Sequence, residues 1–478
     1  MSQLPEGWTA ARLEEIVPHD AIISDGDWVE SKDQDPTGNV RLIQLADIGD
    51  GDFKDKSQRF MNEEAASRLN CSYLSKGDLL VARMPDPLGR ACLFPGVGQK
   101  AVTVVDVCFI QEKILSALSN KLLMHWINSP IIRGEISANA SGSTRKRITR
   151  KKLEKFSFPI PPLAEQTRIV EKLDEVLAQV DTIKARLDGI PAILKRFRQS
   201  VLAAAVSGKL TEEWRGECDY IENSLGEGWK WGAMPSNWTA KFYPELVDSR
   251  LGKMLDKNKN VGKATKYLGN INVRWFGTDL SNVQEILVSD KEQEELSLSK
   301  GDVLICEGGE PGRCCVWSKD SDEVIVFQKA LHRARVKKEM VSEWLVYNLK
   351  NDADGLILNQ LFTGTTIKHL TGKALKNYPI RVPPIEEQKE IVRLVDQYFA
   401  FADTIEAQVK KAQARVDKLT QSILAKAFRG ELVPQDPNDE PADKLLERIA
   451  AARKEAEALA KAAKKVETAR KQPKVHNV

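Results

Sequence analysis

Apolar residues recur at three- and four-residue steps along two long stretches of the chain. The first stretch runs from Leu163 to Leu187, directly after Pro161-Pro162, and the second runs from Ile385 to Val409, directly after Pro383-Pro384. This spacing places the apolar side chains on one face of an otherwise charged helix. We therefore predict two long amphipathic helices, with a kink or break in the first at residues 188–191, which include a glycine and a proline.

The two stretches are near-copies at a constant separation. Residues 160–210 match residues 382–432, and pairs such as Glu165 with Glu387 and Gly208 with Gly430 lie 222 residues apart. A period this long indicates duplication of a whole domain with its connector rather than a solenoid of small repeats. Two matching apolar stripes favour an antiparallel coiled coil of the two helices over two ordinary core helices.

Short runs of strand type and one helical segment precede each long helix. The first set lies at residues 40–45, 78–82, 102–105 and 118–132, and the second at 266–268, 303–305, 324–326 and 344–349. These patterns predict an α+β fold with a pseudo-two-fold internal repeat. The predicted divisions are a first domain at 1–158, a helical spacer at 159–210, a connector at 211–233, a second domain at 234–380, a distal helical spacer at 381–432 and a charged, alanine-rich helix or tail at 433–478. For that last segment a surface helix with a frayed end is favoured over a docking helix.

Composition narrows the class of protein. The chain of 478 residues is 42% hydrophobic, carries a net charge of +3, and contains no apolar run of about 18 residues. Its first residues lack the pattern of a secretory signal. Seven cysteines without a CxxC pair and five scattered histidines predict reduced thiols, a cytoplasmic location and no metal site.

Sequence motifs for catalysis are missing from the chain. It contains no GxxxxGK[ST] phosphate loop, and neither the Asn-Pro-Pro-Phe/Tyr nor the Asp-Pro-Pro-Tyr tetrapeptide that amino-methyltransferases use. The glycine-rich segment 308–313 lacks a phosphate-binding lysine and contains a glutamate, so it is interpreted as a turn. We therefore expect a protein that is not an enzyme by itself and binds no cofactor of its own. A basic cluster at residues 143–152 is the clearest candidate for phosphate contact, although such a run can also be a solvated surface.

Three stretches of the chain carry distinctive motifs. They are Pro161-Pro162-Leu163-Ala164-Glu165-Gln166, Gly208-Lys209-Leu210-Thr211-Glu212-Glu213-Trp214-Arg215 and the segment from Leu419 to Leu432. These motifs resemble those of type I restriction–modification specificity subunits, most closely the type IA branch. The Leu-Pro-x-Gly-Trp opening at residues 4–8 and the Gly-Asp-Leu-Leu run at 77–80 extend the resemblance to nearly the whole chain. The helical motifs are specific, whereas the two α+β domains match only in outline.

The resemblance implies a scaffold that reads DNA. Each α+β domain would be a target-recognition domain for one half of a split, asymmetric double-stranded sequence, and the helices would set the distance between the halves. Two adenine methyltransferase subunits using S-adenosylmethionine and two restriction–translocation subunits using ATP and Mg²⁺ would supply the chemistry. No membrane partner is implied.

Candidate site residues follow from this resemblance and from residue type. The family contacts DNA partly through a loop before the last strand of each domain, and hydroxyls, arginine and lysine suit contacts to phosphates and guanine. The candidates in these loops are Ser143, Thr144, Arg145, Lys146, Arg147, Thr365, Thr366, Lys368 and His369. Gln44, Arg83, Arg90, Asn272, Arg274 and Arg313 are further candidates, each of which could equally be a structural partner. Candidates for the helices and for partner docking are Glu165, Gln166, Leu173, Leu177, Val180, Glu387, Gln388, Val395, Phe399 and Ile405.

Two other classes of function stay open at this point. One is a coiled-coil DNA-binding adaptor without sequence specificity. The other is the recognition part of a self-contained methyltransferase, which the missing catalytic tetrapeptide disfavours. The DNA sequence itself and the length of its spacer cannot be derived from these patterns.

Overall fold

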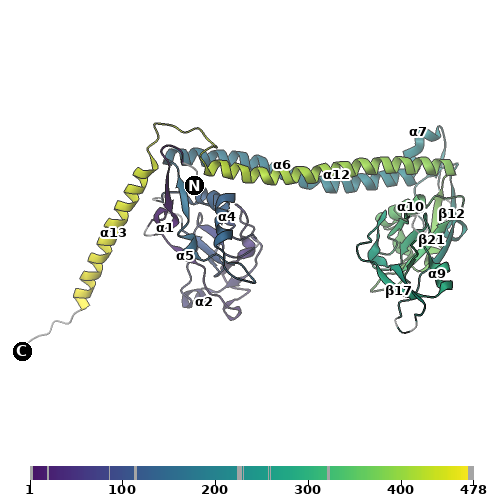
Figure 1. Cartoon of the computed structure of the whole chain (residues 1–478), viewed down its shortest axis with the longest axis horizontal. Helices are drawn as coiled ribbons and strands as arrows, with labels where there is room; N and C mark the ends of the chain where they lie inside the picture. The colour runs from purple at the N-terminus through teal and green to yellow at the C-terminus, as the bar shows by residue number, and fades with distance from the viewer. Residues whose placement is uncertain are drawn as a thin grey trace, which may run out of the picture. The chain divides into compact units, whose positions relative to one another are not determined.

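The computed structural model describes residues 4–18, 21–85, 87–111, 116–222, 229, 231–256, 258, 260–319 and 323–471. The chain divides into two compact units, of which unit 1 comprises residues 1–187 and 412–478 and unit 2 comprises residues 188–411. Each unit holds one α+β domain together with a segment of each long helix (Figure 1).

The first domain is built on two sheets and a strand pair that joins its beginning to its end. Its strands are β1 (Thr9–Arg12), β2 (Ile23–Asp25), β3 (Val40–Ile43), β4 (Phe60–Met61), β5 (Leu79–Ala82), β6 (Ala91–Leu93), β7 (Lys100–Thr103), β8 (Val107–Ile110) and β9 (Ser157–Ile160). The sheet orders are β2-β8-β5-β6 and β4-β3-β7, and β1 pairs with β9. Only β3 and β7 are parallel among these described pairs.

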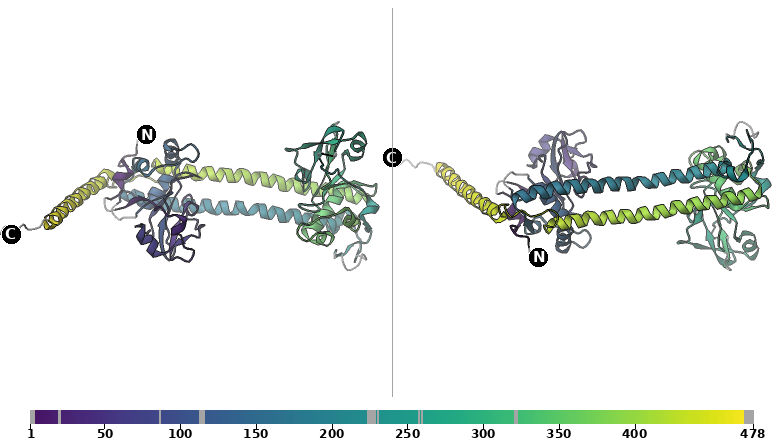
Figure 2. Two further views of the ribbon diagram at one scale, coloured as in Figure 1. Left: turned by 90° about the horizontal axis from the view of Figure 1, so that it is seen from below. Right: turned by 90° about the horizontal axis from the view of Figure 1, so that it is seen from above.

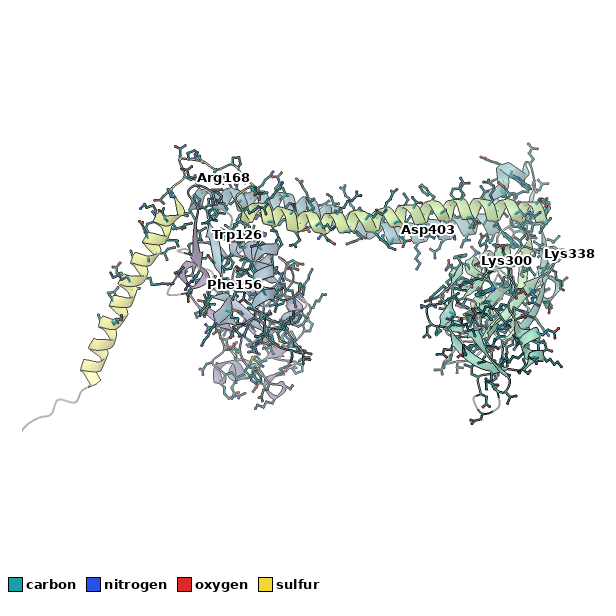
Figure 3. All side chains as sticks on the ribbon, viewed as in Figure 1. Trp126, Phe156, Arg168, Lys300, Lys338 and Asp403 are labelled. Carbon is teal, nitrogen blue, oxygen red and sulfur yellow. The ribbon has the colours of Figure 1, made fainter. Side chains whose placement is uncertain are left out.

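The helices of the first domain are short, and the sequence pattern overstated the length of one. They are α1 (Leu13–Ile16), η1 (Ser31–Asp33), η2 (Leu45–Asp47), α2 (Glu63–Arg68), α3 (Asn120–Asn128), α4 (Pro130–Asn139) and α5 (Arg150–Leu153). The helical spacing over 118–132 is divided between α3 and α4, because the Ser129 side chain caps the N-terminus of α4 and Pro130 takes its first position. The α3 residue Trp126, labelled in Figure 3, is fully buried. It donates its indole N–H to the Pro159 carbonyl at 2.9 Å.

The second domain repeats this sheet topology. Its main strands are β12 (Thr239–Phe242), β13 (Val247–Leu251), β14 (Lys263–Leu268), β17 (Gln284–Val288), β18 (Val303–Cys306), β19 (Cys314–Val316), β20 (Ile325–Phe327), β21 (Leu331–Val336) and β22 (Pro379–Val382). The sheet orders β13-β21-β18-β19 and β17-β14-β20, with the pair β12-β22, match those of the first domain strand for strand. The duplication therefore extends from the helices to the weakly similar domains.

The remaining elements of the second domain and its connector are small. Two short strand pairs are β10 (Tyr220–Ile221) with β11 (Met234–Pro235) and β15 (Val273–Arg274) with β16 (Gly277–Thr278). The helices are η3 (Lys209–Thr211), α7 (Glu212–Arg215), α8 (Tyr243–Leu246), η4 (Asn270–Asn272), α9 (Asp290–Leu296), α10 (Ser342–Asp354), η5 (Ile357–Leu361) and α11 (Gly372–Leu375). Residues 223–228 and 230 of the predicted connector lie outside the described residues.

The two long helices are α6 (Leu163–Val206) and α12 (Ile385–Phe428). Unit 1 contains the beginning of α6 and the end of α12, and unit 2 contains the end of α6 and the beginning of α12, so within each unit the two helical segments run in opposite directions (Figure 2). Lys184 pairs with Asp417 at 3.0 Å in unit 1, and Arg198 pairs with Asp403 at 2.6 Å in unit 2. The predicted break in α6 is wrong, because the helix continues through Pro191. Pro191 removes one backbone N–H from the helix, and its side chain is exposed.

The last helix, α13 (Ala442–Lys471), begins against the first domain. The Ala442 N–H donates to the Gly7 carbonyl at 2.9 Å, and Arg453 donates to the carbonyls of Glu14 and Val17 at 2.7 and 2.8 Å. Ile449 is buried in the core of unit 1. The beginning of α13 is therefore packed within the chain rather than free on the surface. The expected frayed end extends into residues 472–478, outside the described residues.

Candidate nucleic-acid interface

In each domain one loop precedes the last strand, and the two loops have the same backbone hydrogen-bonding pattern. We name residues 141–148 the first loop and residues 363–370 the second loop. In the first, Ser141 and Arg147 exchange backbone hydrogen bonds of 3.0 and 2.8 Å. In the second, Thr363 and His369 do the same at 2.9 Å in both directions. The two bridging residues are six positions apart in each loop. The bridge of the second loop lies 222 residues after that of the first.

Both loops require glycine at their second residue. Gly142 and Gly364 have φ angles of +114° and +91°, a region that favours glycine. A Cβ atom on either residue would also lie 2.3 or 2.2 Å from a backbone oxygen of the same loop. The two loops therefore share their geometry because both require glycine at the same position.

The last residue of each loop is buried and anchors the loop to the sheet. In the first domain, Ile148 donates its N–H to the carbonyl of Arg83 at 3.1 Å and accepts from the Arg83 Nε–H at 3.2 Å. In the second, Leu370 donates to the carbonyl of Glu307 at 2.7 Å, and its own carbonyl lies 3.0 Å from the His332 Nε2. Because a carbonyl only accepts, the His332 Nε2 carries a proton in this contact.

The tips of the loops face solvent. Ser143, Thr144, Arg145 and Lys146 are exposed in the first loop, as are Thr365, Thr366, Ile367, Lys368 and His369 in the second. Within the described part of the chain, the side chains of Arg145, Lys146 and Lys368 have neither a hydrogen-bond nor an ion-pair partner. Arg147 is half-buried, and its Nε atom is buried without a hydrogen-bond partner among the described residues. The tips thus present cations and hydroxyls that no described protein group engages.

Known proteins share this sequence and fold. The family model described as type I restriction modification DNA specificity domain matches residues 5–192 and 235–413. The chain belongs to this family. It is 37% identical to the EcoKI specificity subunit of Escherichia coli strain K12 over 69% of this chain and 71% of that protein. It is 36% identical to the StySPI specificity subunit of Salmonella potsdam, over 70% and 72% respectively.

Solved structures agree with the fold of a specificity subunit. The HsdS subunit from Thermoanaerobacter tengcongensis is matched with a TM-score of 0.54 at 22% identity, over 90% of this chain and 98% of that chain. A chain from a structure titled for assembly and conformational transition of the type I R-M system is matched with a TM-score of 0.67 at 21% identity, over 90% and 100%. Type I specificity subunits are non-catalytic recognition subunits, as the sequence predicts for this chain.

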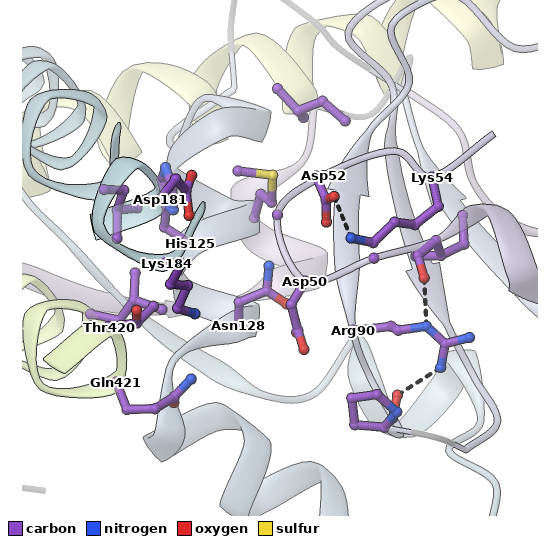
Figure 4. A pocket seen from close by; sticks show the side chains of 18 of the residues that line it. Asp50, Asp52, Lys54, Arg90, His125, Asn128, Asp181, Lys184, Thr420 and Gln421 are labelled. Carbon is purple, nitrogen blue, oxygen red and sulfur yellow. Dashed lines mark hydrogen bonds and ion pairs between the residues drawn. The ribbon is translucent and has the colours of Figure 1, made fainter. Parts of the chain in front are cut away.

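The other candidate arginines of the specificity subunit are occupied by contacts inside the domains. Arg83 also donates to the Val105 carbonyl at 3.1 Å and pairs with Asp25 at 2.5 Å. Arg90 is buried and donates to the carbonyls of Ile48, Pro87 and Leu45 at 2.6, 3.0 and 2.7 Å, a network drawn in part in Figure 4. Both residues thus make the structural contacts that the sequence left open as an alternative, and a contact of either with DNA stays a prediction.

The remaining candidates in the domains are tied into local turns. The Asn272 amide is buried and bonds Gly269, Asp279 and Asn282 at 2.9 Å each. Arg274 bonds Asp279, and Arg313 bonds Glu310 and the Asn270 carbonyl. Gln44 is half-buried at the start of η2. A contact of these residues with DNA stays a prediction, and the geometry favours a structural role for Asn272 above all.

The two glutamates predicted for partner docking bond groups within the chain. Glu387 is fully buried and accepts from Trp238 at 3.0 Å, Thr211 at 2.8 Å and Arg215 at 2.5 Å. Glu165 accepts from Trp8 at 2.9 Å, while its Oε1 atom is buried without a hydrogen-bond partner among the described residues. Burial raises the pKa of Glu165 above its ordinary value.

The glutamines next to these glutamates make matching hydrogen bonds in the two units. The apolar candidates lie on the apolar stripes of the two long helices. Gln166 donates to the carbonyls of Ala117 and Pro161, and Gln388 donates to those of Glu339 and Pro383. Leu173, Val180 and Val395 are buried, whereas Leu177, Phe399 and Ile405 are half-buried. The polar pairs at 165–166 and 387–388 are thus intramolecular joints, and their use in partner docking stays a prediction.

A hollow of about 1210 Å³ lies between the first domain and the helices of unit 1 (Figure 4). Its charged lining residues largely neutralise one another: Asp52 pairs with Lys54, Lys121 with Asp174, and Lys184 with Asp417. His125 at its wall is buried, and burial lowers its pKa to about 4. This mixed lining does not single out a ligand. In the described ranges no cluster of three or more metal-ligating side chains occurs, and none of the described helices is long and apolar enough to cross a membrane.

Proposed function

We propose that this specificity subunit reads a bipartite, asymmetric DNA sequence, one half with each α+β domain. The observation that supports this most directly is the pair of loops with one backbone design and different exposed side chains. A duplicated scaffold that differs at its exposed tips suits two readers of different sequences. The exposed cations and hydroxyls have the chemistry that phosphates and base edges require.

The proposed complex contains two modification subunits and two restriction subunits in the cytoplasm. The modification subunits would bind S-adenosylmethionine and methylate adenine, and the restriction subunits would bind ATP and Mg²⁺. The specificity subunit would contribute DNA recognition and the spacing between half-sites. The long helices α6 and α12 are the proposed surfaces for docking of the modification subunits.

Exchange of one domain tests this function. Residues 234–380 are replaced by the equivalent domain of a relative, the chimera is expressed with the modification subunit, and methylated motifs are mapped across the genome. One half of the motif should change and the other half should persist, because the first domain keeps all of its residues. The unaltered chain and a chimera exchanged at 1–158 are the matched controls. A motif that changes in both halves, or in neither, would contradict the proposal.

A second measurement separates a specific reader from a DNA-binding adaptor without specificity. Binding of the complex to its mapped motif is compared with binding to the same duplex carrying a single altered base pair. A specific reader should lose roughly 5- to 150-fold in affinity for each altered position. Equal affinities for the two duplexes would favour the adaptor.

A further inference from the structure

The first and second loops can be compared position by position. Their backbones are closed by the same hydrogen bonds, and each has a glycine with positive φ at its second residue. Three positions keep their chemistry: Ser143 matches Thr365, Thr144 matches Thr366, and Lys146 matches Lys368. One exposed position at the loop tips changes its chemistry, since Arg145 matches Ile367. Two readers of different sequences should share their contacts to the uniform phosphate backbone and differ where they touch bases.

The last matched pair is less suited to reading bases. Arg147 is half-buried at the closing bridge of the first loop. His369 occupies the same bridge in the second loop, where its ring lies against Gly308, so that a Cβ atom on that glycine would be 3.1 Å from the His369 Nδ1. Arg147 is therefore partly covered by its domain and the exposed His369 ring lies beside Gly308, whereas Arg145 and Ile367 lie at the loop tips.

We infer that Arg145 and Ile367 are the specificity-determining residues of the two loops, and that the flanking hydroxyls and lysines hold phosphates. An arginine side chain can bond the O6 and N7 atoms of guanine in the major groove. Isoleucine has no donor or acceptor, and the base feature that its side chain matches is the methyl group of thymine. Arg145 would thus read a G·C pair in one half-site, and Ile367 an A·T pair in the other.

The environment of Ile367 supports this assignment. Its side chain is 65% exposed at a loop tip, although an isoleucine there gains nothing from burial within the chain. Contact with a thymine methyl group would remove that apolar surface from water. Arg145 is similarly exposed without a described protein partner, so neither residue is needed to hold its loop.

This inference rests on the proposed function, and reciprocal substitutions test it. Arg145→Ile and Ile367→Arg are made separately in the full chain and expressed with the modification subunit, and methylated motifs are mapped. Arg145→Ile should lose the preference for guanine at one position of one half-site. Ile367→Arg should replace a preference for thymine by one for guanine at one position of the other. Relative methylation of the two bases should shift roughly 5- to 150-fold.

Matched controls distinguish reading from simple attraction. Lys146→Ala and Lys368→Ala should lower methylation at all sites alike and reduce the salt slope of binding by about one each, without changing the motif. Arg145→Lys keeps the charge but lacks the two-pronged guanidinium, so it should relax the same single position and preserve the salt slope. It also serves as the test if Arg145→Ile reduces the yield of folded protein.

Two outcomes would overturn the inference. One is an unchanged motif in Arg145→Lys and Ile367→Arg, and the other is a uniform loss of affinity with no change in base preference. The domain exchange shows which idea has failed. If that exchange alters one half of the motif while the loop variants do not, the loops are not the readers but the function stands. If the exchange alters nothing, the proposed function fails as well.

Discussion

At the scale of single residues, the side chains behind the recognition loops matter as much as those at the tips. Arg83 in the first domain and His332 in the second use different chemistry for one purpose, because each holds the carbonyl of the residue that ends its loop. Burial lowers the pKa of His332, which keeps the ring neutral near pH 7. Arg83, which the sequence offers as a candidate for DNA contact, thus also helps to position the first loop.

Arg83→Lys should loosen the first loop and leave the second unchanged. Lysine keeps the charge beside Asp25 but has no Nε–H directed at the Ile148 carbonyl. We expect faster amide hydrogen exchange over residues 141–148 of the free chain and weaker discrimination in one half-site, with an unchanged salt slope. If Arg83 contacts DNA instead, the salt slope should fall by about one while exchange in the free chain stays the same.

His125 should make unit 1 sensitive to acid. Its pKa is about 4 in the folded chain and 6.5 ordinarily, so unfolding takes up a proton between these values. The stability of unit 1 should fall as the pH drops from about 6.5 toward 4, by at most about 3 kcal/mol. Denaturant unfolding at several pH values checks this. His125→Phe should flatten this dependence, and a slope that persists in the variant would assign it to other groups.

At the scale of elements, a buried glutamate joins each domain to its helix, but the two glutamates have different hydrogen-bond partners. Glu387 has a buried guanidinium partner in Arg215, whereas the matching Glu165 accepts a hydrogen bond from the Trp8 indole. The difference arises because the residues after Gly430 do not repeat the Thr211 and Arg215 that follow Gly208. One glutamate is therefore part of a buried ion pair, and the other is a buried carboxylate with one oxygen that no described group bonds.

Glutamine at these two positions should have opposite effects. Glu165→Gln keeps an acceptor for Trp8 and removes a buried charge, so unit 1 should be as stable or more stable at pH 7. The raised pKa of Glu165 means that its charged form costs stability as the pH rises above about 4.5. Glu387→Gln leaves the Arg215 charge buried without its counter-ion and should cost about 3–5 kcal/mol in unit 2. Hydrogen exchange resolved by segment measures both, and equal losses would contradict the asymmetry.

The elements themselves were largely predictable from the sequence, and the side-chain roles were not. The period of apolar residues identifies α6 and α12, because an apolar stripe that persists over many turns is typical of a long amphipathic helix. The predicted break at Pro191 is wrong because local preference does not include the contacts along α6 before and after the proline. The roles of Arg83, Arg90 and Glu387 depend on partners 22 to 176 residues away, which no local pattern reveals. Ile367, which we propose as a specificity residue, is not among the candidates from the sequence, although its alignment with Arg145 is a usable signal.

At the scale of the whole molecule, the helices that pass through both units are the proposed ruler for the half-sites. A heptad inserted into α6 after Leu187 and another into α12 after Lys411 falls where the two units meet, and it leaves the contacts within each unit intact. Each helix becomes about 10 Å longer. The spacer between half-sites should grow by up to about three base pairs, at 3.4 Å each. The spacer should grow by less than this if the domains cannot follow the rotation of one half-site relative to the other about the axis of the duplex.

Genome-wide mapping of methylated motifs measures the spacer. Both half-sites should keep their own sequences, because no residue of either loop has changed. A heptad inserted into α6 alone is the control, and it should disturb the pairing of the helices and reduce activity. An active double variant that still methylates the original spacing would contradict the ruler.

Unit 1 is assembled from both ends of the chain, and this has a consequence for synthesis on the ribosome. The first domain and the beginning of α6 emerge early, but Leu424 and Ala427 of α12, which complete their core, emerge roughly 240 residues later. At about 5–20 residues per second this interval lasts roughly 10–50 s. During it the apolar stripe of α6 lacks its partner. Nascent chains stalled near residue 400 should therefore be cut by protease within 163–187, and this first-made unit should be the last to become stable.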